Sequence, residues 1–270
     1  MKFILPVALA GVLASVAPAF AVPTTIWAVD ASATGSGVSN AAYAEQFSLA
    51  GQLLQRVTLG SGFNPTGIAI VGNTGYVSTD TSGRLYTFNL STGALGATYT
   101  TGQNALGPLT FDGTNLLAAD SAGGNQVYRY SLTGAYVGQF TISSLASNIN
   151  GLEYEAGTVI ANRGQNAGPY DRYSSTGMLL QANAFNAGDD GAVAYNPDNA
   201  TQYAAVSGGT GGFQTFPGGT TVLFGSNIAD SGFGTSDRFI NDLAIQVPEP
   251  ATLTLLAAGL AFMGVRRRRA

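Results

Sequence analysis

The sequence predicts an all-β protein whose main body is a β-propeller of five four-stranded blades. Three observations predict this fold: a repeat of about 42 residues, two strand-pair patterns within each repeat, and half-repeats at the two ends that complement each other. The composition agrees, because 37 glycines and 45% apolar residues suit short strands and tight turns around a buried core.

The chain starts with a segment typical of a secretory signal peptide. Met1-Lys2 is followed by an apolar run over 3–17 and then by Ala19-Phe20-Ala21. A positive start, a short apolar stretch and a small-x-small site together mark such a peptide, and the run is short for a membrane anchor. We expect signal peptidase to remove residues 1–21, leaving a propeller body over 22–246.

Five stretches of the body share an aromatic residue, a polar turn that contains glycine, and an alternating apolar strand. Their aromatic residues are 41, 42, 43 and 43 positions apart: Phe47, Phe88, Tyr130, Tyr173 and Phe216. Glycine supplies the positive φ that such turns need, so each stretch is predicted to form a hairpin.

A second series of strand pairs precedes these hairpins, at 65–80, 106–120, 149–162 and 190–207. The two series together give four strands per repeat, as in a propeller blade. Residues 240–247 resemble a first strand without partners after it, and 24–30 resemble a second strand without a first. We expect these two strands to pair and close the ring. An open β-solenoid or a sandwich is the alternative, but a solenoid would not predict complementary half-repeats.

Oxygen-bearing side chains recur in the loops that would share one face of the ring. The loops that lead into first strands carry Asn64, Asn104, Asn148, Asn150, Asp189, Asp190, Asn241 and Asp242, and the second strands end in Asp30, Asp80, Asp120, Asn162 and Ser207. Turn chemistry alone explains Asn and Asp at such places. The functional alternative is a hard cation such as Ca²⁺, with Asp30, Asp80, Asp120 and Asn162 as its ligands. In architecture the body resembles gluconolactonase-like propellers, which implies a cation held there by Glu, Asn and Asp.

Composition excludes several classes of site. The chain has no cysteine and no histidine, so a Ser-His-Asp triad, a thiolate nucleophile and a His-ligated metal centre cannot be built. The body over 22–246 holds six arginines and 14 acidic residues, a net charge of −8. Such a body does not suit nucleic acid or anionic membrane surfaces, whereas it suits cations.

The C-terminus, residues 247–270, combines Pro248-Glu249-Pro250, an uncharged run of 15 residues over 251–265, and Arg266, Arg267, Arg268 and Arg269. The run is short for a transmembrane helix, but the arginines would hold its cytoplasmic end and leave the body outside. Motif, order and position resemble a PEP-CTERM sorting signal. The resemblance implies a Gram-negative bacterium that makes extracellular polysaccharide, and cleavage near Pro248-Glu249-Pro250 by an exosortase.

We therefore expect an exported protein that passes through the inner membrane and reaches the cell surface or the medium. A non-catalytic propeller that binds matrix polysaccharide or another protein is the favoured function. A cation-dependent extracytoplasmic hydrolase or lactonase is the alternative, in which Asp or Glu would act as the base because histidine is absent.

Overall fold

The computed structural model describes residues 24–31, 41–61, 64–143, 149–162, 169–186, 191–205, 211–224 and 240–247. The predicted signal peptide with Ala19 and Ala21, the triplet Pro248-Glu249-Pro250 and the Arg266–Arg269 block lie outside these residues. Within them, no helix is long and apolar enough to cross a membrane. The propeller strands all belong to one compact unit, Pro23–Val247.

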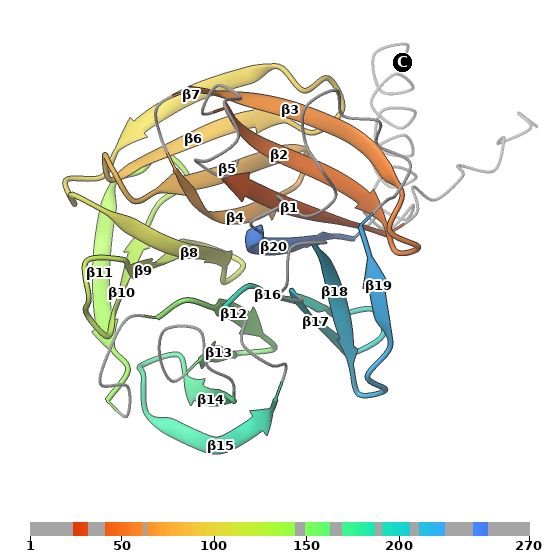
Figure 1. Cartoon of the computed structure of the whole chain (residues 1–270). Helices are drawn as coiled ribbons and strands as arrows, with labels where there is room; N and C mark the ends of the chain where they lie inside the picture. Colours follow the sequence, from red (N-terminus) through yellow and green to blue (C-terminus); the bar gives the residue numbers. More distant parts are fainter. Residues whose placement is uncertain are drawn as a thin grey trace, which may run out of the picture. The chain divides into compact units, whose positions relative to one another are not determined.

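Twenty strands form five antiparallel sheets of four, which confirms the five-bladed propeller (Figure 1). From the innermost strand outwards, blade A is β20 (Ile240–Gln246), β1 (Thr25–Ala31), β2 (Ala41–Ser48) and β3 (Leu53–Ser61); blade B is β4 (Pro65–Val71), β5 (Thr74–Thr79), β6 (Arg84–Asn89) and β7 (Leu95–Thr100); blade C is β8 (Leu106–Phe111), β9 (Leu116–Asp120), β10 (Gln126–Tyr130) and β11 (Tyr136–Thr141); blade D is β12 (Leu152–Glu155), β13 (Thr158–Asn162), β14 (Tyr170–Ser174) and β15 (Leu179–Phe185); blade E is β16 (Val193–Asn196), β17 (Thr201–Ala205), β18 (Gly212–Phe216) and β19 (Thr221–Leu223).

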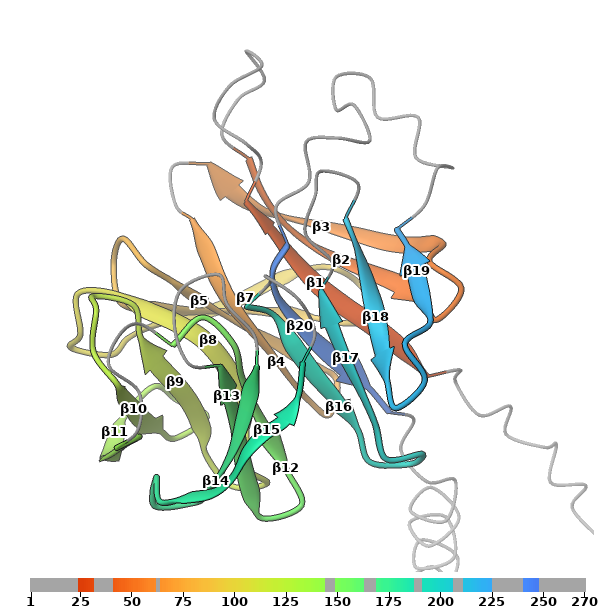
Figure 2. The same ribbon diagram turned by 60° about the horizontal axis from the view of Figure 1, so that its bottom comes forward.

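The predicted ring closure is also confirmed. β20 pairs antiparallel with β1, with Ile26 opposite Ile245 and Ala28 opposite Leu243. Each inner strand contacts the inner strand of the next blade all the way round, so the five blades enclose a central channel (Figures 1 and 2).

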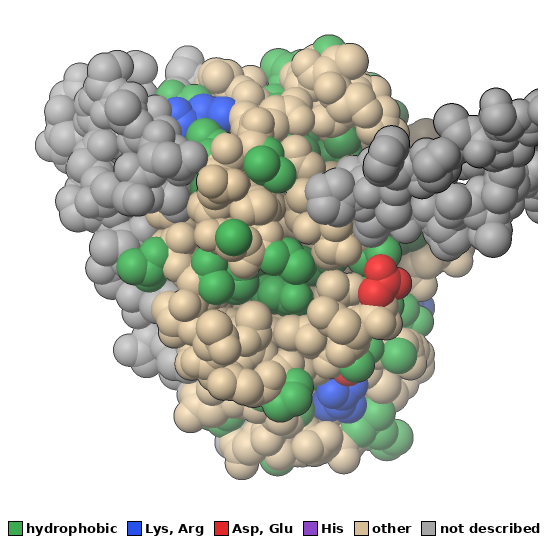
Figure 3. All heavy atoms as spheres, turned by 90° about the vertical axis from the view of Figure 1, so that its right-hand side faces the viewer, with side chains coloured by type: hydrophobic (Ala, Val, Ile, Leu, Met, Phe, Trp, Pro, Cys, Tyr) green, Lys and Arg blue, Asp and Glu red, His purple; other side chains and the backbone are tan. Residues whose placement is uncertain are grey.

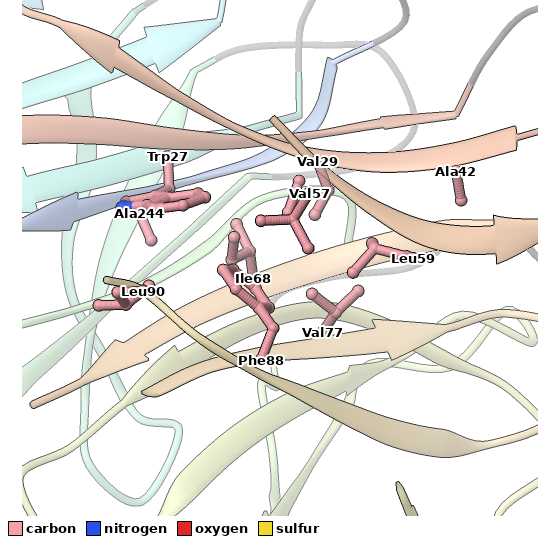
Figure 4. Close-up of a cluster of buried hydrophobic side chains, with 11 residues drawn as sticks. Trp27, Val29, Ala42, Val57, Leu59, Ile68, Val77, Phe88, Leu90 and Ala244 are labelled. Carbon is pink, nitrogen blue, oxygen red and sulfur yellow. The ribbon is translucent and has the colours of Figure 1, made fainter. Parts of the chain in front are cut away.

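Apolar side chains fill the spaces between neighbouring blades. Between blades A and B, Trp27, Val57 and Phe88 pack in one buried cluster (Figure 4). The Trp27 Nε1 group donates to Gln246 Oε1 at 2.9 Å, so the polar edge of this buried ring is paired across the closing strands. Between blades A and E, the ring of Phe47 stacks on that of Phe224 at 3.9 Å.

The outermost strands are the exposed part of each blade. All the exposed large hydrophobic residues among those described lie on these strands or directly before one: Leu54, Leu95, Tyr136, Val137, Met178, Leu179, Leu180 and Leu223. The face drawn in Figure 3 shows hydrophobic groups among polar ones, with few charged side chains. The outer rim is thus weakly charged.

The glycines of the repeated turns have a second role that the repeat pattern does not reveal. Each of four turns between the third and fourth strands packs on the outer strand of the preceding blade, through Gly51, Gly93, Gly134 and Gly177. A Cβ on Gly177 would lie 2.1 Å from the carbonyl oxygen of Thr141 in the neighbouring blade. These positions therefore need glycine for the space between blades as well as for φ.

Replacing Gly177 by alanine should cost more stability than replacing Gly157. Both residues have positive φ, 88° and 91°, so the backbone strain of an alanine, about 1–2 kcal/mol, is similar. Only Gly177 has a neighbour in the way, because nothing lies within 4 Å of a Cβ on Gly157. Overpacking should add about 1–3 kcal/mol for Gly177→Ala, measured by urea unfolding. Equal losses in the two variants would contradict the proposed packing between blades.

Candidate functional site in the central channel

The channel has two ends, and the residues predicted as cation ligands lie at the end where the inner strands begin. Asp80 follows β5, and its Oδ2 accepts a hydrogen bond from Asn64 Nδ2 at 2.9 Å. Asn241 Nδ2 in turn donates to Asn64 Oδ1 at 3.3 Å. The structure thus brings together Asn64, Asp80 and Asn241, three of the oxygen-bearing residues predicted to share this face, from blades A and B.

Asp120 and Asn162 are engaged within their own blades. Asp120 Oδ1 accepts from the backbone N–H of Ala122 at 2.9 Å, and Asn162 Oδ1 accepts from those of Asn150 and Gly151 at 2.9 and 3.1 Å. These bonds are the turn chemistry expected of Asp and Asn. Asp30 is described by its backbone alone, opposite Tyr43 in β2.

Among the described residues, no group of three or more carboxylates gathers as a metal centre. A calcium site made by Asp30, Asp80, Asp120 and Asn162 stays a prediction.

Two further acidic residues lie on the inner strands themselves. When the five inner strands are aligned, Asp242 takes the place of Gly67, Pro108, Gly151 and Ala192. Two residues further on, Glu153 takes the place of Ala69, Thr110, Ala194 and Ala244. The sequence reasoning placed Asp242 in the loop that leads into β20 and missed Glu153. Comparing equivalent inner-strand positions would have revealed both as acidic outliers among mostly small residues.

Asp242 joins the inner strands of three blades. It lies on β20 with none of its surface exposed, and its Oδ2 accepts from the backbone N–H of Ile68 on β4 at 2.9 Å. The same oxygen accepts from the N–H of Leu109 on β8 at 3.0 Å. Backbone groups that face the channel in blades B and C are therefore satisfied by a side chain from blade A.

Glu153 joins the inner strands of the other two blades to blade C. It lies on β12, its Oε2 accepts from the hydroxyl of Thr110 on β8 at 3.2 Å, and its carboxylate also accepts from the backbone of Tyr195 on β16. The Thr110 oxygen itself accepts from the N–H of Tyr154 at 3.2 Å. Together, Asp242 and Glu153 reach the inner strands of all five blades.

The electrostatics of the pair follow from its burial. Burial raises the pKa of Asp242 well above its usual range, although hydrogen bonds from backbone N–H groups oppose this shift. Burial, followed by the negative charge of Asp242, also raises the pKa of Glu153 well above its usual range. Two acids in one channel therefore disfavour each other's charged form.

A cavity of about 350 Å³ lies where the inner strands end. All five blades contribute to it, and Glu153 and Thr110 lie in its wall beside the rings of Phe111, Tyr154 and Tyr195. Its size falls within the range of small-molecule sites, which are mostly apolar with a few polar groups.

The comparisons with known proteins concern the tail and the fold separately. The model of the PEP-CTERM protein-sorting motif matches residues 246–269. The chain carries a PEP-CTERM sorting motif. This confirms the resemblance seen in the sequence, and the motif implies export, sorting to the cell envelope and processing by an exosortase.

Solved structures with similar folds are distant in sequence. A chain in the crystal structure of a nidogen/laminin complex is 10% identical, with a TM-score of 0.54 over 84% of this chain and 100% of that chain. The Myxococcus xanthus glutaminyl cyclase is 19% identical, with a TM-score of 0.49 over 77% of this chain and 84% of that one. The comparison with curated proteins found no match. At these identities, the nidogen/laminin likeness shows the fold alone, and the cyclase supports no conclusion.

Truncating Asp242 in this PEP-CTERM protein should destabilise the propeller. Asp242→Ala leaves the N–H groups of Ile68 and Leu109 without their acceptor, at a cost of about 1–3 kcal/mol each. Asp242→Asn keeps an oxygen acceptor of the same shape and should lose clearly less. Urea unfolding of both variants at one pH makes the comparison. Wild-type stability in Asp242→Ala would contradict the structural role of this carboxylate.

Proposed function

We propose that the protein is exported, sorted to the cell surface and binds a neutral matrix polysaccharide in the channel cavity without acting on it chemically. The cavity is the observation that carries the proposal. Its wall offers aromatic rings of Phe111, Tyr154 and Tyr195 to the apolar faces of a sugar, and Glu153 and Thr110 to its hydroxyls.

Size and charge narrow the ligand. A cavity of about 350 Å³ suits one or two sugar units, whereas a stable protein interface buries about 1,200–2,000 Å². The net charge of −8 over 22–246 repels polyanions, so a neutral polysaccharide fits better than an acidic one. A protein partner is therefore the less favoured ligand.

Sorting assigns roles to the two ends of the chain. In our proposal, signal peptidase cuts after Ala21 and Arg266–Arg269 stop transfer at the cytoplasmic side, so that the tail spans the inner membrane. Exosortase then cuts near Pro248-Glu249-Pro250, and the body is delivered to the surface or the medium. Sorting and binding thus use separate parts of the chain.

The enzyme alternative is a cation-dependent hydrolase or lactonase. The observation that favours it is the position of Glu153 in the cavity wall, with a second carboxylate, Asp242, buried in the same channel. Two carboxylates beside a sugar site are the usual equipment of glycoside hydrolysis. Release of new reducing ends from the bound polysaccharide would favour this alternative over simple binding.

Tyr195→Ala should weaken polysaccharide binding about tenfold. The loss corresponds to about 1.4 kcal/mol of ring contact with the sugar, near the upper end for aromatic pairs. Tyr195 belongs to no buried hydrophobic cluster among the described residues, so its removal should spare the fold. Tyr136→Ala is the control, because Tyr136 lies on the outer strand β11 and is 52% exposed.

The measurement is isothermal titration with oligosaccharides prepared from the matrix polysaccharide of the producing bacterium. Binding by the wild type and by Tyr136→Ala, weakened in Tyr195→Ala, is the expected result. No binding by the wild type, or equal binding by both variants, would overturn the cavity as the polysaccharide site.

A further inference from the structure

The two channel acids have no basic partner among the described residues. The ion pairs in this part of the chain join Arg56 to Glu45 at 2.5 Å and Arg172 to Glu155 at 2.9 Å. Arg129 binds the carbonyl of Ser175 and covers the ring of Phe140, and Arg84 is exposed at the start of β6. The single lysine of the chain is Lys2. Two negative charges are thus placed in the channel without a balancing side chain.

One oxygen of the pair is also left without a partner. Asp242 Oδ2 takes both backbone hydrogen bonds, while Asp242 Oδ1 is fully buried and has no hydrogen-bond partner in the structure. An unpaired carboxylate oxygen at such a place costs about 1–3 kcal/mol or more, since burial strips its water. A group that supplies positive charge to this oxygen would remove that cost.

Oxygen atoms suited to a hard cation lie in the same channel. Glu153 is in the cavity wall, which gives a path from the surface, and Thr110 lies beside it with its hydroxyl on Glu153 Oε2. Carboxylates, hydroxyls, backbone carbonyls and water are the ligands of calcium, which accepts 6–8 oxygens in irregular geometry. Magnesium demands near-ideal octahedral geometry and fits a channel of irregular ligands less well.

We propose that the central channel binds one calcium ion through Asp242 Oδ1 and the carboxylate of Glu153, with water from the cavity completing the shell. One divalent cation balances the two carboxylates. The site is separate from the predicted ligands Asp30, Asp80, Asp120 and Asn162, and it does not depend on polysaccharide binding. Extracellular modules hold calcium with dissociation constants of about 10⁻⁴–10⁻³ M, so the ion would bind after export.

The test uses the purified exported protein, stripped with chelator and titrated with CaCl₂ by calorimetry and thermal melting. We expect one ion per chain and a melting temperature that rises with calcium concentration, because an ion that binds only the folded state stabilises it. Glu153→Gln and Asp242→Asn keep the shape of each side chain but remove its charge. Each should weaken calcium binding at least tenfold and abolish the melting shift at 1 mM calcium, while circular dichroism shows that the variant is folded.

Asp80→Asn and Asp120→Asn are the matched controls, because they remove one carboxylate charge at the opposite end of the channel. Both should bind calcium like the wild type. A wild-type protein without heat or melting shift at millimolar calcium would overturn the proposal, since protons would then neutralise the pair. Binding that survives in Glu153→Gln and Asp242→Asn but is lost in Asp80→Asn or Asp120→Asn would also overturn it, and would place the ion among the residues where the inner strands begin.

Discussion

The pairing of β20 with β1 is the constraint on which the rest of the propeller depends. It supplies blade A with its inner strand from the far end of the chain, so that five blades close into a ring. The same pairing brings Asp242 into the channel, where it accepts the backbone N–H groups of Ile68 and Leu109. One strand therefore closes the ring at its edge and satisfies its centre.

Closure by a late strand has an energetic consequence. Strands that pair across more than 200 residues give no reward until most of the ring is formed, because the loop between them must first be closed. The contacts that hold β20 are numerous once formed: the hydrogen bond from Trp27 to Gln246, the shared apolar clusters with blades B and E, and the Asp242 carboxylate. The cooperativity of the body is thus concentrated at this junction.

The fold could be predicted from the sequence because its signals are local and repeated. Aromatic residues from Phe47 to Phe216 recur every 41–43 positions, and the half-repeats at 24–30 and 240–247 reveal the closure. The site could be predicted only in part, since its geometry depends on which blades meet across the channel. Asn64, Asp80 and Asn241 were expected on one face and do meet, through hydrogen bonds between blades A and B. Glu153 gave no signal in its own stretch, because its meaning comes from Asp242, 89 positions away, and from equivalent strands that carry alanine or threonine.

The most direct test of ring closure through Asp242 is amide hydrogen exchange at Ile68 and Leu109 in the wild type and in Asp242→Ala. In the wild type, both amides should exchange as slowly as those of the central strands, because their acceptor is buried in the channel. In Asp242→Ala, these two amides should exchange much faster while those of β5 and β6 stay protected. Fast exchange of Ile68 and Leu109 in the wild type would contradict the account, since it would show that no side chain holds the channel ends of blades B and C.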